Sequence, residues 1–239
     1  MSISTSAGVE RLSPAQIERR LEESSVAYIP LGSLEFHGPH LPIGLDALTA
    51  HGICLRAAAL SGGIVLPPYY QGVGGEHSRY PWTIMSGSPE AIEVLLGETL
   101  ARLDEFGVRQ AVIVSGHFAD EQKLLASRVS ERWNSGGAAL RAVSTTLGDA
   151  PGAPEPADHA GVFESLLLLA ISPDLVNVDQ LPDPLAFPAP SNEDPWGQQR
   201  HDTNHPLYGI FGPDPRGLDT KRAEPLLQYM AEWIASLTR

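Results

Sequence analysis

Acidic and imidazole side chains follow a run of apolar residues near the start of the chain, in the stretch 32–46. Glu35 and His37 lie two residues apart, so in extended backbone both side chains would point to the same side. Asp46 comes nine residues after His37, at the expected start of a helix. Two carboxylates and an imidazole are suitable ligands for zinc or manganese. The spacing alone is also compatible with a helix-capping aspartate and a Glu-x-His pair on the surface.

Two later stretches place further candidates beside apolar segments. His117 follows the strand-like residues 110–114, and ligand sites form at the carboxyl ends of parallel strands. Glu164 begins the run Glu-Ser-Leu-Leu-Leu-Leu. A carboxylate in that position is either a first-turn partner of the helix dipole or a buried ligand.

Strand-like and helix-like segments alternate along the chain and would position these residues. Strands are expected at residues 26–31, 64–66, 110–114 and 139–145, and helices from residue 13 and at 46–60, 88–106, 120–134, 161–171 and 221–237. This alternation predicts an α/β fold with a mainly parallel sheet covered by helices on both faces. A single domain is expected over residues 1–239. Residues 181–215 carry eight of the 21 prolines, and so long an aperiodic interval is expected to be a lid or a partner-contacting arm.

Composition and charge exclude several classes of function. Of the 239 residues, 42% are hydrophobic and 19% are charged, as in a soluble globular enzyme. The sequence has no run of 18 apolar residues, so no membrane span is expected. It lacks the pattern of a secretion signal at its start, and Cys54 is its single cysteine, so a cytoplasmic protein is expected. The net charge of −13 argues against a nucleic-acid interface, which needs clustered Lys and Arg.

Five blocks, in order along nearly the whole chain, resemble the signature of the creatininase family. The blocks are EFHGPHLP followed by Asp46 (family E-Q-H-G-P-H-L-P, then D), EHSRYPWTI (E-H-x-x-F-P-G-T-I), SGH (N-G-H), HAGVFES (H-A-G-x-x-E-T) and GIFGPDPR (a late G-D-P-R turn). Because five separate blocks match in order, the resemblance is specific. It implies a three-layer α/β/α sandwich.

The resemblance also implies a binuclear metal centre. Its ligands would be Glu35, His37, Asp46, His117 and Glu164, with Asp46 bridging. Two divalent ions, zinc first and manganese or iron as alternatives, would lower the pKa of a water molecule and polarise the scissile carbonyl. Catalytic roles fall to Glu164 and to His159, which would position the substrate or shuttle a proton. His159 could instead cap the start of the following helix.

The same comparison assigns six residues to substrate binding, with some departures from the family pattern. They are Glu76, His77, Tyr80, Trp82, Phe118 and Asp120. Creatinine-hydrolysing members carry a glutamate where Ala119 stands, so either Glu164 or Asp120 would complete the ligand set. Trp82 replaces a glycine, so its indole would either narrow the pocket or fill the core.

These inferences predict a metal-dependent amidohydrolase that cleaves a C–N bond of amide type with a metal-activated water. Its substrate would be a small molecule or a short peptide, with creatinine itself a poor one. The alternatives are a peptidase that trims a short precursor, an amide-forming biosynthetic enzyme and a metal-free pseudoenzyme. The family resemblance further implies a homo-oligomer, a hexamer, with no nucleic-acid or membrane partner.

Overall fold

A parallel sheet forms the centre of the computed structural model, which describes residues 7–190 and 192–238. Its strands are β1 (Val26–Leu31), β2 (Ile64–Val65), β3 (Gln110–Ser115) and β4 (Arg141–Thr146). They pair in the order β2-β1-β3-β4, and every pair is parallel. The pairing of β1 with β3 runs from Val26 opposite Gln110 to Leu31 opposite Ser115. The carboxyl ends of these two central strands therefore meet at one edge of the sheet.

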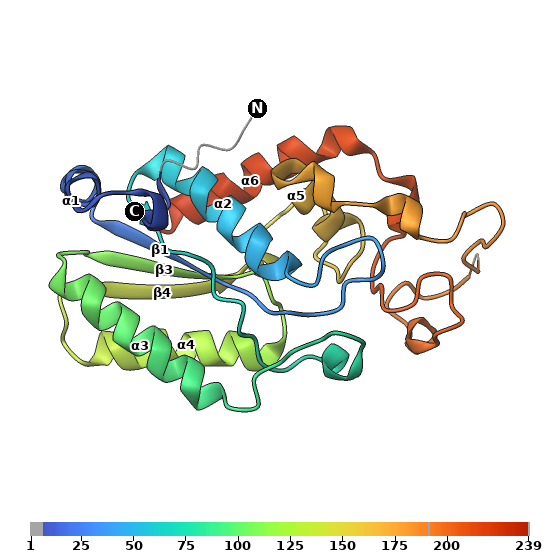
Figure 1. The fold of residues 1–239 in the computed structure, drawn as a ribbon, viewed down its shortest axis with the longest axis horizontal. Coiled ribbons are helices and arrows are strands. Elements are labelled where there is room, and N and C mark those ends of the chain that lie inside the picture. The colour runs from blue at the N-terminus through green and yellow to red at the C-terminus, as the bar shows by residue number, and fades with distance from the viewer. Residues whose placement is uncertain (1–6, 191, 239) are drawn as a thin grey trace.

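Helices cover both faces of this sheet (Figure 1). One face carries α2 (Leu45–Ser61), α5 (Val162–Ile171) and α6 (Ala223–Ser236), and the other carries α3 (Pro89–Glu105) and α4 (Asp120–Ser135). Successive residues of a strand pack into the apolar cores on opposite faces of the sheet. Tyr28 packs with the first group of helices, and Ala27 and Ile29 pack with the second. The expected three-layer α/β/α sandwich is confirmed.

Most element boundaries agree with the sequence-based expectation. The first helix, α1 (Pro14–Glu23), begins after a capping box in which the Gln16 side chain accepts the Ser13 backbone N–H at 2.8 Å. The last helix begins at Ala223 rather than residue 221, because Thr220–Arg222 forms a separate 3-10 turn. In the described part of the chain, no helix combines the length and hydropathy needed to cross a bilayer.

The proline-rich interval 181–215 folds against its own domain. Arg200 is buried, and its guanidinium donates to the Glu193 carboxylate at 2.5 Å and to the carbonyl oxygens of Ile210 and Gly212 at 2.8 and 3.1 Å. Leu207 joins a buried apolar cluster with residues of α2 and α5. The Arg200 hydrogen bonds lie within the interval and order it, whereas the Leu207 cluster holds it against α2 and α5.

Candidate metal centre

Four elements bring the predicted ligands to the carboxyl edge of the sheet. Glu35 and His37 follow β1, His117 follows β3, and Asp46 and Glu164 lie in the first turns of α2 and α5. Glycines beside β1 and β3 allow the start of α2 to lie close to the ends of these strands. A Cβ at residue 116 would collide with the carbonyl oxygen of Asp46, and one at residue 32 would collide with the backbone of residue 47. The start of α2 therefore packs directly on both strand ends.

The five predicted ligands form one buried cluster around Asp46. Glu35 Oε2 lies 2.8 Å from His117 Nδ1, which lies 3.4 Å from Asp46 Oδ2. On the other side of the same carboxylate, His37 Nε2 lies 3.0 Å from Asp46 Oδ1 and 3.5 Å from Glu164 Oε2. All five side chains are almost completely buried.

The cluster divides into two groups that could each hold a cation. Glu35, Asp46 and His117 form one group and His37, Asp46 and Glu164 the other, with ligand atoms within 4.8 Å of one another, and Asp46 belongs to both. Glu35 and His37 also form a third such group with His159. Glu35 Oε2 and His37 Nε2 are close to their neighbours but lack an aligned hydrogen-bond partner. Buried polar atoms normally have partners, so these atoms fit a bound cation.

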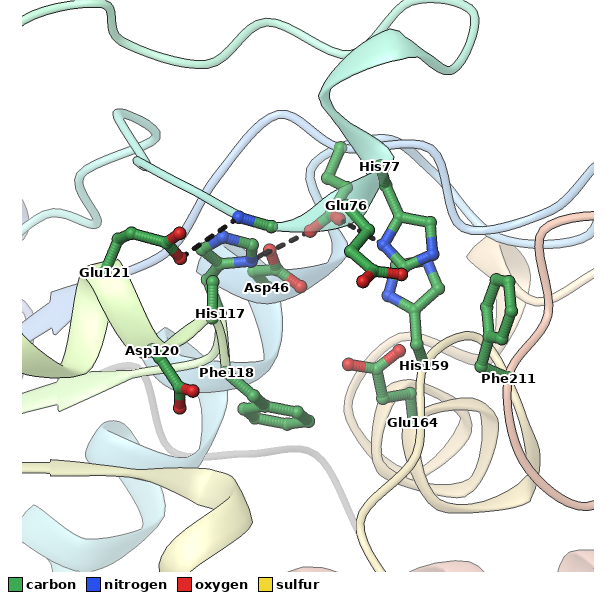
Figure 2. A pocket seen from close by; sticks show the side chains of 13 residues that line it. Asp46, Glu76, His77, His117, Phe118, Asp120, Glu121, His159, Glu164 and Phe211 are labelled. Atoms are coloured by element: carbon green, nitrogen blue, oxygen red, sulfur yellow. Dashed lines mark hydrogen bonds and ion pairs between the residues drawn. The ribbon is translucent and has the colours of Figure 1, made fainter. Parts of the chain in front are cut away.

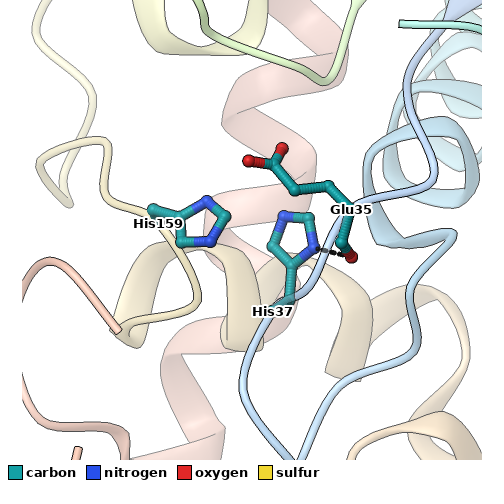
Figure 3. A group of neighbouring side chains, drawn as sticks. All are labelled: Glu35, His37 and His159. Atoms are coloured by element: carbon teal, nitrogen blue, oxygen red, sulfur yellow. Dashed lines mark hydrogen bonds between the residues drawn. The ribbon is translucent and has the colours of Figure 1, made fainter. Parts of the chain in front are cut away.

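Hydrogen bonds around the cluster orient its members. The Ser33 hydroxyl donates to Asp46 Oδ2 at 2.5 Å, and the backbone N–H of Ala160 donates to Glu164 Oε2 at 2.6 Å. His37 donates from Nδ1 to the backbone carbonyl of Glu35 at 2.9 Å (Figure 3), which leaves Nε2 for the carboxylates of Asp46 and Glu164. Outer hydrogen bonds of this kind select the tautomer and direction of metal-ligating side chains.

The charges of the cluster depend on one another. Burial alone would lower the pKa of His37, but the carboxylates of Asp46 and Glu164 outweigh it and raise this pKa to about 10. Burial raises the pKa of Glu164 well above its ordinary value, although His37 opposes the shift. Without a cation, protons therefore offset the carboxylate charges, and a bound metal ion has to displace them.

His159 lies over the cluster but is held differently. Its ring stacks on His77, with centroids 3.9 Å apart and planes 5° apart, and on His37 at 4.4 Å (Figure 3). Its Nε2 donates to the carbonyl of Phe36 at 2.9 Å. Burial, together with positive charge on His37 and His77, keeps the pKa of His159 well below its ordinary value. His159 is therefore neutral, and its Nδ1 keeps a lone pair.

A cavity of about 600 Å³ opens above the cluster (Figure 2). Its lining residues are Glu35, Asp46, Gly75, Glu76, His77, His117, Phe118, Ala119, Asp120, Glu121, His159, Glu164 and Phe211. Four of the six predicted substrate-binding residues, Glu76, His77, Phe118 and Asp120, are among them. His77 also has Nδ1 3.0 Å from Glu35 Oε1, so it contacts a predicted ligand as well as the cavity.

Two predicted substrate-binding residues lie elsewhere. Trp82 is 80% exposed and does not line the cavity, so it neither narrows the pocket nor fills the core. Its backbone is left-handed, with φ of 63°, and the turn directs the indole outward. Tyr80 is buried behind His77, with ring centroids 5.0 Å apart, and its hydroxyl lies 2.6 Å from His201 Nδ1. It supports the cavity wall without lining it.

The two candidates for the fifth ligand, Glu164 and Asp120, lie in different surroundings. Glu164 faces His37 inside the cluster, whereas Asp120 lies exposed in the first turn of α4 and belongs to neither ligand group.

The sequence interpretation missed two residues that line the cavity, Glu121 and Phe211. Phe211 reaches the cavity through a two-residue antiparallel bridge with His159, a contact that only the folded chain creates.

Comparisons with known proteins agree with this geometry. The family model described as creatininase, creatinine amidohydrolase, matches residues 10–238. The mycofactocin precursor peptide peptidase of Mycolicibacterium smegmatis is 34% identical over 159 residues, which cover 64% of this chain and 60% of that protein. The creatinine amidohydrolase of Pseudomonas putida is 27% identical over 190 residues, 68% of this chain and 71% of that protein.

The fold comparison covers almost the whole chain. A crystal structure of creatinine amidohydrolase superposes with a TM-score of 0.78 at 23% identity, over 98% of this chain and 97% of that one. In sequence, the chain spans about three fifths of the length of the mycofactocin precursor peptide peptidases it matches. The match of the family model to residues 10–238 establishes that the chain belongs to the creatininase family.

Proposed function

We propose that this chain hydrolyses a C–N bond of amide type in a small molecule or short peptide, with two divalent metal ions. Glu35, Asp46 and His117 would hold one ion, and His37, Asp46 and Glu164 the other. The observation that carries the proposal is the position of Asp46, whose two carboxylate oxygens face His37 on one side and His117 on the other. A carboxylate in that position can be shared by both ions.

The donor set supports zinc first, with manganese or iron as alternatives. Imidazole nitrogens and carboxylate oxygens suit these metals, and the described cysteine, Cys54, is buried in the core away from the cluster. Structures of related creatininases are described as a Zn–Zn type and as a manganese form. When bound, a pair of divalent ions would lower the pKa of a water molecule and polarise the scissile carbonyl.

His159 is the residue that we assign to proton transfer. It lines the cavity, it is neutral, and its Nε2–H is engaged by the carbonyl of Phe36. Its Nδ1 can therefore accept a proton during hydrolysis and return it to the leaving nitrogen. The stacked rings of His37 and His77 limit the rotation of this imidazole.

The relatives support two substrate classes, a small cyclic amide and a short peptide, because their names include a creatinine amidohydrolase and precursor peptide peptidases. Ala119 stands in the cavity lining where creatinine-hydrolysing members carry a glutamate, which makes creatinine a poor candidate. We further infer a single cytoplasmic domain that assembles into a homohexamer. Residues 181–215 would serve as the lid or the arm of this assembly.

The test is hydrolysis by protein stripped of metal with a chelator and then reconstituted with zinc or manganese. A panel of small amides and short peptides should be cleaved only after reconstitution. Asp46→Asn should abolish cleavage, whereas Asp174→Asn, at an exposed carboxylate in the turn Pro173–Leu175, should not. Cleavage by chelator-treated protein, or by Asp46→Asn at the normal rate, would contradict the proposal.

A further inference from the structure

The cavity has a strongly one-sided charge. Six carboxylates line it: Glu35, Asp46, Glu76, Asp120, Glu121 and Glu164. No lysine or arginine among the described residues joins them. Three of the six belong to the ligand groups at the floor. The other three, Glu76, Asp120 and Glu121, are exposed to solvent and are called the mouth carboxylates below.

The mouth carboxylates have little to offset their charge. Within the described residues, the Asp120 side chain makes no hydrogen bond or ion pair, and the Glu76 side chain has only His201, at 3.8 Å. Glu121 accepts a long hydrogen bond of 3.4 Å from the backbone N–H of Gly75. The nearest lysine on the same helix, Lys123, pairs instead with Asp149 at 3.2 Å.

Floor and mouth differ in what they can attract. Two divalent ions would bring about four positive charges to a floor with three carboxylates, so the floor would become slightly positive. Glu35 Oε2, which is buried 2.8 Å from His117 Nδ1 but has no aligned hydrogen-bond partner, belongs to this floor and fits a cation bound there. The three mouth carboxylates would remain unneutralised, and a cavity with such walls concentrates positively charged ligands.

Two aromatic rings complete the walls. Phe118 lies two residues before Asp120 in the chain, and the Phe211 ring centroid lies 6.4 Å from that of His159 (Figure 2). Phenylalanine rings bury flat apolar groups and attract cations at their faces. The cavity therefore combines a carbonyl-binding floor, apolar sides and an anionic mouth.

We propose that the substrate carries a positively charged ammonium or guanidinium group that lies among Glu76, Asp120 and Glu121 while its amide carbonyl faces the floor. This inference rests on the proposed amide hydrolysis, but it concerns the charge of the substrate. It can therefore be wrong while the proposed hydrolysis is right. An anionic group in the same position would be repelled. The substrate class is thus a cationic amide with a flat or apolar part next to its charge.

The test measures binding of phenylguanidine and phenylurea, two ligands of nearly the same shape of which only the first is charged, to the metal-loaded protein by calorimetry at low salt. Phenylguanidine, a cation at neutral pH, should bind roughly tenfold more tightly than phenylurea, with about twofold from each of the three mouth carboxylates. Raising the salt should reduce the preference because salt screens exposed charges. Asp120→Asn and Glu121→Gln should each reduce it, and the double variant should nearly abolish it, with unchanged metal content.

The matched control is Glu131→Gln, which removes an exposed carboxylate of α4 outside the cavity and should leave the preference unchanged. Equal binding of the two ligands, failure of phenylguanidine to bind, or a preference that survives in the double variant would overturn the proposal. These outcomes leave amide hydrolysis intact if the reconstituted enzyme still cleaves its panel. Loss of all cleavage would instead contradict the proposed function.

Discussion

Replacing Ser33 with alanine tests whether hydrogen bonds around Asp46 set metal affinity. The Ser33 side chain is fully buried, and its hydroxyl donates to Asp46 Oδ2 at 2.5 Å. Alanine removes only the oxygen, so the packing should be preserved. A hydrogen bond to a charged group is worth about 1.5–3 kcal/mol. Loss of an outer-shell partner lowers metal affinity by roughly 10- to 100-fold, about 1.4–2.8 kcal/mol, so the two estimates agree.

The assay compares zinc affinity and metal-dependent stability in Ser33→Ala and wild type. Affinity can be measured by competition with a chelator of known strength. Because each tenfold loss removes about 1.4 kcal/mol of metal-dependent stabilisation, zinc should raise the melting temperature by roughly 3–10 °C less in the variant.

The matched control for this experiment is Ser130→Ala. Ser130 is also buried, but its hydroxyl has no hydrogen-bond partner among the described residues. Its replacement should leave zinc affinity unchanged. The reasoning is refuted if Ser33→Ala binds zinc as tightly as wild type, or if Ser130→Ala loses as much affinity as Ser33→Ala.

Three further predictions follow from the backbone and the charges of the site. Gly116→Ala should lower the melting temperature and the metal content, because the added Cβ would collide with the Asp46 carbonyl. Gly97→Ala, in open space on α3, should instead stabilise the protein by up to about 1 kcal/mol, and calorimetry with metal analysis that finds no difference between the two variants would contradict this. Zinc affinity should rise with pH, up to about tenfold per unit for each proton displaced between about pH 6 and 8, because the pKa of His37 is raised to about 10 in the absence of metal; a flat profile in chelator competition would argue against displaced protons. Trp82→Gly should leave the substrate profile unchanged and should be more stable than Trp82→Ala by about 1 kcal/mol in denaturant unfolding, since φ of 63° suits glycine; equal stabilities would show that this backbone carries no strain.

The layers and the ligand cluster could be predicted because the residues that form them follow local sequence patterns. Buried strands such as 110–115 are nearly continuous in apolar residues, and a polar residue placed just after such a strand lies at the carboxyl edge of the sheet. Glu35, His37 and His117 all follow this rule. Asp46 and Glu164 were candidates from their positions beside expected helices, and the family signature then implied that both are ligands; they lie in the first turns of α2 and α5.

The cavity walls could not be predicted in the same way. The family pattern places Trp82 in a loop near the site, but the direction of its side chain depends on a left-handed backbone conformation. The neighbouring residue types do not predict that conformation. Phe211 lies 52 residues beyond His159 in the chain, and their pairing depends on the path of the proline-rich interval between them. Periodicity and motif spacing carry no information about such a path.

The number of metal ions bound per chain tests the central claim most directly. Reconstituted wild type should hold about two ions by elemental analysis, Glu35→Gln and Glu164→Gln about one each, and Asp46→Asn fewer than either. This order follows because Asp46 is shared by the two proposed ion sites, while Glu35 and Glu164 each belong to one of these two. A wild type that holds about one ion or none, or an Asp46→Asn variant with the full complement, would contradict the shared-carboxylate site.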